Sequence, residues 1–172
     1  NSNNLGELEL ASFKILAELV ESSSTLRYLD LGGNHLEALD RADQTDGDED
    51  AEGAGSRGRW AMLTNALHRN RSLRDLSLRG NDLSAISDAG WAALMNFLEH
   101  DTSIIDLSLR ETGLGKMPLA RWEQLACAIR GNSTLLTLQL RGNAVRQQCS
   151  LQIKRVLAGS LMGHRTLVHV YG

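Results

Sequence analysis

Leucines recur along the chain in a pattern that alternates with polar residues and ends in an asparagine. The pattern reads L-x-x-L-x-L-x-x-N-x-L, and four segments follow it in one phase from Leu26, Leu73, Ile104 and Leu135, with a fifth starting at Leu167. Such self-similarity at a fixed period is typical of repeat architectures. The alternation in L-x-L places every second side chain on one face of a short strand. The pattern therefore predicts successive short strands whose leucines point into a core.

A segment with helical periodicity follows each predicted strand. Its apolar residues recur at intervals of three and four, as on one face of an α-helix. These positions are Phe13, Leu16 and Val20; Trp60, Leu63 and Leu67; Trp91, Leu94 and Leu98; and Trp122, Leu125 and Ile129. Ser87 and Pro118 are residue types that often begin helices. The predicted unit is a strand followed by a full helix, about 31 residues long (104 − 73 and 135 − 104).

This repeat resembles the leucine-rich repeat family over essentially the whole chain. The unit is longer than the roughly 20–29 residues usual for that family, and long units with full helices resemble its ribonuclease-inhibitor-like subclass. The resemblance implies an α/β solenoid shaped like a horseshoe, with parallel strands on the concave face and helices on the convex face. It also implies an intracellular, cytoplasmic protein, because that subclass is mostly intracellular.

The repeats predict one leucine-rich-repeat domain over residues 1–172, with about five repeats. Natural arrays end in atypical capping repeats. Here both ends of the chain cut through a repeating unit, and neither end has the character of a cap. We therefore expect a fragment of a longer array.

The asparagine that ends each pattern, as in Asn34, Asn81 and Asn143, is expected to satisfy backbone groups in the turn. Successive asparagines would then stack as a ladder between repeats. Thr112 occupies this position in the third repeat. A hydroxyl can do part of the same work, so we expect a local weakness at Thr112 rather than a break.

Two further motifs have both a structural and a functional interpretation. Trp60, Trp91 and Trp122 fall in one helical column, and because they share a phase with the buried leucines we favour core packing over a ligand-stacking ladder. Residues 70–72 and 132–134 are glycosylation sequons. Helix-to-strand turns favour Asn, Ser and Thr for their own backbone hydrogen bonds, so we favour the structural interpretation here as well.

The residues between the inward leucines should form rows across the exposed face of the sheet. Neighbouring strands lie about 4.8 Å apart, so equivalent positions of successive repeats become neighbours. The predicted binding surface consists of Tyr28, Asp30, Asp75, Ser77, Arg79, Asp106, Ser108, Arg110, Glu111, Gln139 and Arg141. Its aspartates and arginines lie at opposite ends of the strands, about 13 Å apart. The face is therefore polarised.

Arg79, Arg110 and Arg141 occupy one row, which we call the arginine row. Like charges at strand spacing repel unless an anionic group meets them, and Glu111 can help with one of them. One interpretation is that the arginine row binds an acidic protein segment, since the arginine guanidinium group can form two parallel hydrogen bonds to one carboxylate. The other is that the arginine stems cover the leucine edge while their heads stay in water.

An acidic, glycine-rich insertion interrupts the array after the first strand. Asn34 and Leu73 are 39 residues apart, whereas Asn81 and Ile104 are 23 apart, so sixteen residues (39 − 23) are inserted within residues 40–59. This stretch has almost no apolar residues and should be disordered. It is either a tolerated surface loop or an autoinhibitory segment whose acids fold over the arginine row until a partner displaces them.

Composition narrows the classes of function. A net charge of −3 and a content of 4% aromatic residues do not favour binding to nucleic acid or to a membrane surface. No apolar run is long enough to cross a bilayer. Cys127 and Cys149 are too few for a disulfide framework. Catalytic motifs, metal-ligand spacings and phosphate-binding loops are missing from the sequence. We therefore predict no enzymatic activity, no cofactor and no metal.

The predicted function is a non-enzymatic module that binds a protein partner, with an acidic segment, on its concave strand face. One alternative is a structural component of a large assembly such as a cilium or flagellum, which exposed apolar residues on the convex side would favour; Met95, Met117 and Met162 are the candidates. The other is a GTPase-activating module, since the resemblance extends to Ran GTPase-activating proteins. The oligomeric state does not follow from the sequence.

Overall fold

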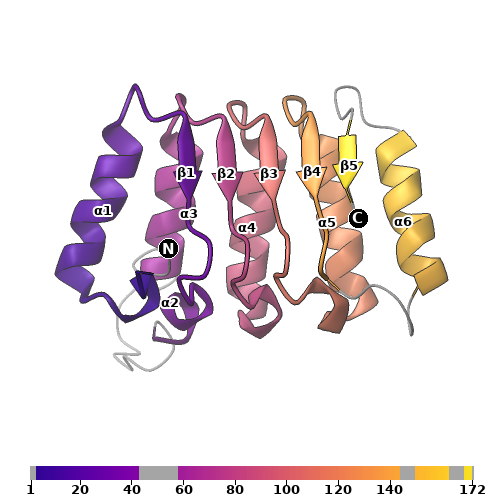
Figure 1. Cartoon of the computed structure of the whole chain (residues 1–172), viewed down its shortest axis with the longest axis horizontal. Helices are drawn as coiled ribbons and strands as arrows, with labels where there is room; N and C mark the ends of the chain where they lie inside the picture. Colours follow the sequence, from indigo (N-terminus) through magenta and orange to yellow (C-terminus); the bar gives the residue numbers. More distant parts are fainter. Residues whose placement is uncertain (1–2, 43–57, 144–149, 163–168, 172) are drawn as a thin grey trace.

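The computed structural model of the chain describes residues 3–42, 58–143, 150–162 and 169–171. Five short strands form one parallel sheet in the order β1-β2-β3-β4-β5 (Figure 1). The strands are β1 (Tyr28–Asp30), β2 (Asp75–Ser77), β3 (Asp106–Ser108), β4 (Thr137–Gln139) and β5 (His169–Tyr171). Each strand therefore lies beside the one that follows it along the chain, as the repeat predicts.

A layer of helices covers one face of the sheet and leaves the other open (Figure 1). The long helices are α1 (Leu10–Ser22), α3 (Arg59–Arg69), α4 (Asp88–His100), α5 (Leu119–Gly131) and α6 (Ser150–Met162). Shorter elements are the helix α2 (Glu37–Ala42) and the 3₁₀ turns η1 (Leu5–Glu7), η3 (Leu83–Ala85) and η4 (Leu114–Lys116). The arrangement confirms the predicted α/β leucine-rich-repeat solenoid, with its strands on the concave face.

The core lies between the sheet and the helices. The middle residues of β2, β3 and β4, which are Leu76, Leu107 and Leu138, are at most 2% exposed. Trp60, Trp91 and Trp122 are equally buried, with 1–2% of their surface exposed. The Nε1 atom of Trp60 donates a hydrogen bond of 2.8 Å to the carbonyl oxygen of Gly90. This burial confirms that the tryptophan column packs the core and leaves no face free for a ligand.

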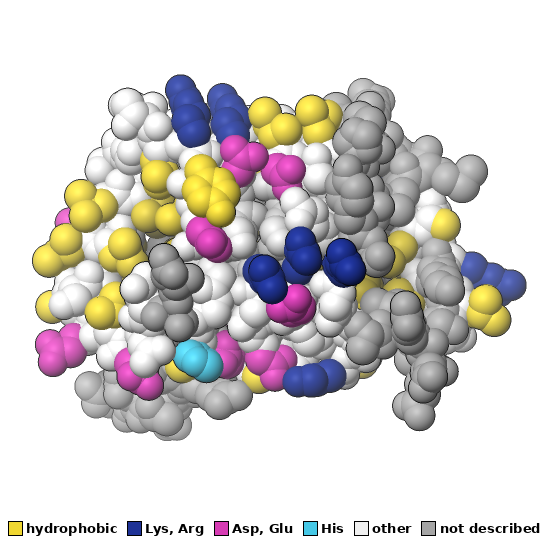
Figure 2. Space-filling view, in the orientation of Figure 1, with side chains coloured by type: hydrophobic (Ala, Val, Ile, Leu, Met, Phe, Trp, Pro, Cys, Tyr) yellow, Lys and Arg dark blue, Asp and Glu magenta, His cyan; other side chains and the backbone are white. Residues whose placement is uncertain are grey.

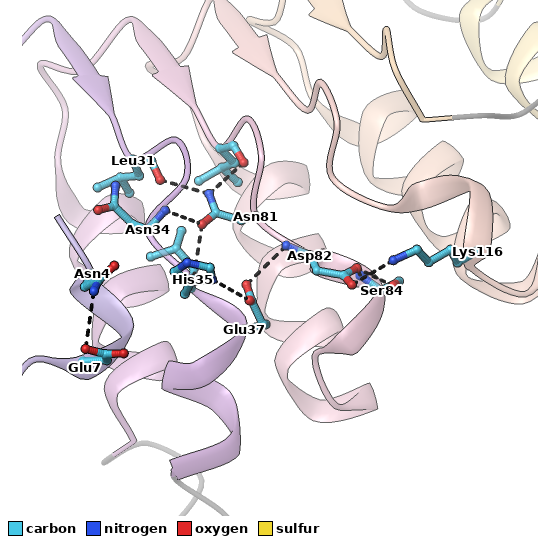
Figure 3. A network of polar contacts seen from close by, with 12 residues as sticks. Asn4, Glu7, Leu31, Asn34, His35, Glu37, Asn81, Asp82, Ser84 and Lys116 are labelled. Atoms are coloured by element: carbon cyan, nitrogen blue, oxygen red, sulfur yellow. Dashed lines mark hydrogen bonds and ion pairs between the residues drawn. The ribbon is translucent and has the colours of Figure 1, made fainter. Parts of the chain in front are cut away.

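The predicted asparagine ladder joins successive repeats after their strands. The side-chain oxygen of Asn81 accepts hydrogen bonds from the backbone N–H groups of Asn34 (3.1 Å) and Leu36 (3.2 Å). Its amide nitrogen donates to the carbonyl oxygens of Leu31 (2.9 Å) and Leu78 (2.8 Å) (Figure 3). One asparagine side chain therefore satisfies backbone groups of two neighbouring repeats.

Thr112 takes part in this ladder with fewer bonds. Its hydroxyl donates to the carbonyl oxygen of Leu109 in its own repeat at 2.7 Å. The contact with the preceding repeat comes from the backbone, where the N–H of Leu83 donates to the carbonyl oxygen of Thr112 at 3.0 Å. Asn143 restores the side-chain bridge one repeat later, accepting from the N–H groups of Thr112 and Leu114. The weakness expected at Thr112 stays a prediction.

A second row of buried polar side chains precedes the strands and includes both sequon asparagines. Asn70 and Asn132 are 0% and 6% exposed. The side-chain oxygen of Asn70 accepts from the N–H groups of Ser72 (2.8 Å) and Leu73 (2.7 Å), and its amide donates to the carbonyl oxygen of Val20 at 2.6 Å. The side-chain oxygen of Asn132 likewise accepts from the N–H groups of Thr134 and Leu135. These bonds confirm the structural interpretation of the two sequons.

The expectation of disorder over residues 40–59 is wrong at the two ends of this stretch, which are ordered. Helix α2 continues to Ala42, and the carboxylate of the buried Asp40 accepts hydrogen bonds from the backbone N–H (2.5 Å) and hydroxyl (2.9 Å) of Ser87. At the other end, Arg59 begins α3 and donates to the carbonyl oxygen of Leu8 at 2.7 Å. These contacts join residues distant along the chain, which the local composition does not predict. Residues 43–57 lie outside the described part.

Candidate binding surface on the strand face

The register of the sheet confirms the predicted rows. Tyr28 pairs with Asp75 and Asp75 with Asp106, and the second row runs from Asp30 through Ser77, Ser108 and Gln139. Backbone hydrogen bonds continue the pairing beyond the strands, where the N–H groups of Gly33, Gly80 and Glu111 donate to the carbonyl oxygens of Arg79, Arg110 and Arg141 at 2.8–3.0 Å. The backbone therefore holds the arginine row in register on the strand face.

A hollow of about 280 Å³ opens on this face. It is lined by Tyr28, Asp75, Leu76, Ser77, Arg79, Asp106, Ser108, Arg110 and Gln139. The lining thus brings together most of the side chains that the sequence predicts as a binding surface. Asp30, Glu111 and Arg141 from that prediction are not among the lining residues.

The three arginines are in unequal surroundings. Arg79 forms an ion pair with Glu111, with its Nη2 atom 3.2 Å from Oε2 and its Nε atom 3.3 Å from the same oxygen. Arg110 is half-buried, and its buried Nε atom has no hydrogen-bond partner among the described residues. Arg141 is exposed, and no acidic side chain of the described ranges pairs with it. The sequence correctly predicts that Glu111 helps one arginine.

Figure 2 shows basic side chains side by side over the carboxyl ends of the central strands, with an acidic group next to them. Acidic side chains also lie near the amino ends of the same strands. Basic side chains also lie beside these acidic side chains at the upper edge of the view, so the predicted polarity of the face stays a prediction.

The acidic end of the hollow combines carboxyl groups with an exposed aromatic ring. Tyr28 is 60% exposed, and Asp75 and Asp106 are half-buried on adjacent strands. The amide of Gln139 donates to Asp106 at 3.1 Å. This end can offer acceptor oxygens and a flat apolar surface to a partner.

Asp30 lies beside the hollow and keeps its charge over a wide pH range. A hydrogen bond from the backbone N–H of Gly32, 3.0 Å from its Oδ1 atom, and a second from the hydroxyl of Ser77 lower the pKa of Asp30. The positive charge of Arg79 acts in the same direction. Asp30 therefore stays ionised well below neutral pH.

In the turns after β1 to β4, the residue that follows the arginine-row position has a backbone φ angle in the left-handed region. This residue is Gly33 (φ 62°), Gly80 (φ 71°) and Gly142 (φ 82°) in three repeats, but Glu111 (φ 56°) in the third. Glycine adopts such angles without steric cost, whereas a side chain does not. The repeat alignment carried this signal, because L-R-E-T in the third repeat stands where its neighbours have L-R-G-N. Sequence reasoning noted the threonine and missed the backbone consequence of the glutamate.

A polar network below the arginine row fixes neighbouring turns to one another (Figure 3). Glu37 accepts from the backbone N–H of Asp82 at 3.2 Å, and the Nζ atom of Lys116 lies 2.9 Å from Oδ2 of Asp82. Hydrogen bonding from Ser84, followed by the charge of Lys116, lowers the pKa of Asp82. Sequence reasoning missed this network, since its members are neighbours only across repeats.

The helix side carries a different kind of surface. Met95 and Met117 are buried, so they are not the exposed convex residues that the structural-assembly interpretation named, and the side chain of Met162 lies outside the described part. Leu10, Ile15 and Leu19 of α1 are instead exposed, and hydrophobic side chains follow the left edge of Figure 2 over this helix.

Within the described ranges, no helix is both long and apolar enough to span a membrane. The same ranges hold no group of His, Cys, Asp and Glu side chains arranged to bind a metal ion.

The described residues have the architecture of a leucine-rich-repeat solenoid, and a family comparison agrees over part of the chain. The family model described as "Leucine Rich repeat" matches residues 22–39 and 69–95. No curated protein matches the sequence.

The solved structure of leiomodin-1 actin-binding site 2 is similar in fold. It is 16% identical with a TM-score of 0.57, and the match covers 94% of this chain and 79% of that chain. The C-terminal domain of tropomodulin from Caenorhabditis elegans matches at 12% identity and a TM-score of 0.46, over 91% of this chain and 93% of that one. At 16% identity, the likeness to the leiomodin-1 structure concerns the fold alone.

Proposed function

We propose that the chain is a non-enzymatic interaction module that binds a protein partner on its strand face. The observation that carries the proposal is the hollow, which collects polar and charged side chains from four adjacent strands, from Tyr28 on β1 to Gln139 on β4. Concave surfaces of this size and polarity suit an extended segment that crosses several strands. The proposal includes an intracellular location, which the resemblance to the ribonuclease-inhibitor-like subclass implies.

The partner segment is acidic where it meets the arginine row. Arg110 and Arg141 have no counter-ion among the described residues, so their guanidinium groups can pair with a carboxylate of the partner. Binding removes water from the guanidinium group and from the group that it meets, and this is favourable only when the two charges are opposite. Binding should therefore weaken as salt concentration rises.

The experiment is affinity capture from a lysate of the source organism. The parent chain is compared with a variant that carries Arg79→Glu, Arg110→Glu and Arg141→Glu. A matched control carries the same charge change at three exposed arginines elsewhere, Arg69→Glu, Arg71→Glu and Arg155→Glu. A partner that is captured by the parent and the control, and lost by the arginine-row variant, supports the proposal. Equal capture by all three chains rejects it.

Purified actin belongs among the candidates in a separate binding assay, because the leiomodin-1 structure is named as an actin-binding site. Co-sedimentation of the parent chain with actin filaments, and binding of monomeric actin, test this directly. Binding of actin to the parent chain but not to the arginine-row variant would identify actin as the partner.

A second candidate function, a structural part of a larger assembly, is favoured by the apolar surface of α1. Leu10, Ile15 and Leu19 are 47%, 59% and 62% exposed, and contiguous apolar surface often marks contacts between proteins. The chain with Ile15→Lys and Leu19→Lys should then be lost from an assembly that the arginine-row variant still joins. Retention of both variants would contradict this alternative.

A further inference from the structure

Glu111 stands at a position where the other described repeats have glycine. Its φ of 56° lies in the left-handed region, beside Gly33, Gly80 and Gly142 at equivalent positions. A glutamate there is strained, because its Cβ atom crowds the backbone. Strain of this kind persists where the surrounding structure holds it, and it often accompanies function. The question is therefore what the Glu111 side chain does.

The Glu111 carboxylate lies against Arg79 of the arginine row, and the Glu111 side chain passes close to Gly142 of the next repeat. It contacts Arg79 of the preceding repeat in three places, at 3.2–3.3 Å. On the other side, a Cβ atom added to Gly142 would come within 2.6 Å of the Cγ atom of Glu111. The absence of a side chain at Gly142 thus leaves the room that the glutamate occupies.

This contact divides the arginine row into a neutralised part and an open part. Arg79 has a carboxylate partner, whereas the buried Nε atom of Arg110 lacks a hydrogen bond within the described residues. Arg141 is exposed, and no ion pair joins it to another described side chain. Adjacent strands are about 4.8 Å apart, so one incoming carboxylate can reach both open guanidinium groups.

We propose that Glu111 is an internal carboxylate ligand that competes with the partner for the arginine row. It neutralises Arg79 and leaves Arg110 and Arg141 for a single carboxylate of an acidic protein segment. Its own negative charge lowers the affinity for acidic segments and sets how much negative charge the site accepts. This inference rests on the proposed function, because it assigns a role within the same surface.

The test is the affinity of fluorescein-labelled hexaglutamate for the full chain and its variants, measured by fluorescence anisotropy at low and high salt. Glu111→Gln removes the charge and keeps the size. Glu111→Gly removes the charge and also relieves the left-handed strain. Glu123→Gln makes the same charge change at an exposed residue of α5. Arg110→Gln and Arg141→Gln remove the open guanidinium groups.

Both Glu111 variants should bind hexaglutamate about two- to fivefold more tightly at low salt, because exposed ion pairs of this kind are weak. Glu123→Gln should leave the affinity unchanged, and Arg110→Gln and Arg141→Gln should weaken it. The gain should shrink at high salt, where charges are screened. If the two Glu111 variants bind with the same affinity although their stabilities differ, the effect comes from the charge of Glu111 and not from its backbone strain.

Unchanged or weaker binding by both Glu111 variants overturns the inference, as does a parent chain that binds no hexaglutamate. Tighter binding of a single-stranded oligonucleotide of equal charge would overturn the choice of a protein ligand. The proposed function is decided separately by the lysate capture, which does not depend on Glu111. A partner lost with the arginine-row variant, together with inert Glu111 variants, would leave the proposed function intact and reject only the competitor role.

Discussion

The repeat built around β3 and the repeats on either side of it share a backbone, but three polar turn positions set the β3 repeat apart. The β3 repeat has Asp101, Glu111 and Thr112 where its neighbours have Asn70 and Asn132, Gly80 and Gly142, and Asn81 and Asn143. The strand register is the same on both sides. The substitutions therefore change side-chain bonding between repeats and leave the sheet in place.

The comparison shows that one repeat can lack side-chain hydrogen bonds to the preceding repeat while the solenoid keeps its architecture. Asn143 bridges to the preceding repeat through both ends of its amide, whereas the Thr112 hydroxyl makes no bond to the repeat of β2 among the described residues. Each repeat of a solenoid contacts only its neighbours, so a weaker step stays local. This step, which has fewer side-chain bonds between its repeats, lies beside the arginine row, where Glu111 adds a charge that glycine cannot.

The largest expected effect comes from removing a complete bridge. Asn81→Ala breaks four hydrogen bonds at a buried site and should lower the free energy of unfolding by about 3 kcal/mol, whereas Thr112→Ala should cost about 1 kcal/mol. Urea denaturation followed by circular dichroism measures both. Asn96→Ala, on the exposed side of α4, is the control and should change little. Equal losses at residues 81 and 112 would break the comparison.

Asp101→Asn should stabilise the fold by about 1–2 kcal/mol. Asp101 is 2% exposed, and its carboxyl group accepts bonds from Ser103 and Ile104. The amide of Asn132 makes the equivalent bonds and also donates to the carbonyl oxygens of Leu98 and Asp101. An amide at residue 101 gains these donors and removes a buried carboxyl group. The urea midpoint should rise, and Asn132→Asp should lower it by a similar amount.

Thr112→Asn should restore the missing bridge between the repeats of β2 and β3. An asparagine there can accept from the backbone N–H of Asn81, as Asn143 accepts from that of Thr112 at 2.9 Å. Its amide can donate to the carbonyl oxygen of Leu78, as that of Asn143 donates to Leu109 at 2.6 Å. We expect a gain of about 1 kcal/mol in the free energy of unfolding, the usual net value of one hydrogen bond. Thr112→Val keeps the size without the hydroxyl and should show no gain. An unchanged melting temperature for the asparagine variant would show that the step is already satisfied.

The smallest effect is the pH dependence of the contact between Asp82 and Lys116. The pKa of Asp82 is lowered from 3.8, through Ser84 and then Lys116. Its contribution to stability is therefore full above the unfolded value near 4 and is lost as the pH falls through the lower folded value. Because the pair is exposed, Asp82→Asn should cost only a few tenths of a kcal/mol at neutral pH. Urea denaturation at pH 7 and pH 3 should show the two chains converging in acid.

The sequence predicted the part of the surface that follows from repetition. Strand positions, the rows from Tyr28 to Gln139 and the arginine row all follow from one phase, because equivalent residues of successive repeats become neighbours in a parallel sheet. The same argument placed the tryptophans in the core and the ladder asparagines in the turns.

Contacts between residues at non-equivalent positions of different repeats could not be predicted in this way. Asp40 lies in a compositionally polar stretch, yet it is buried against Ser87, which is 47 residues away. The pairing of Glu111 with Arg79 depends on a left-handed backbone angle and on the space above Gly142.

The sequence by itself determined the strand-and-helix unit, its parallel stacking and the rows of polar side chains on the strand face, because each depends on residue type at a repeated position. The tertiary structure decided which arginine is neutralised, which polar side chains gather in the hollow and where the insertion joins the fold. These features depend on backbone angles and packing distances between repeats, and such distances are set only when the neighbouring elements have docked.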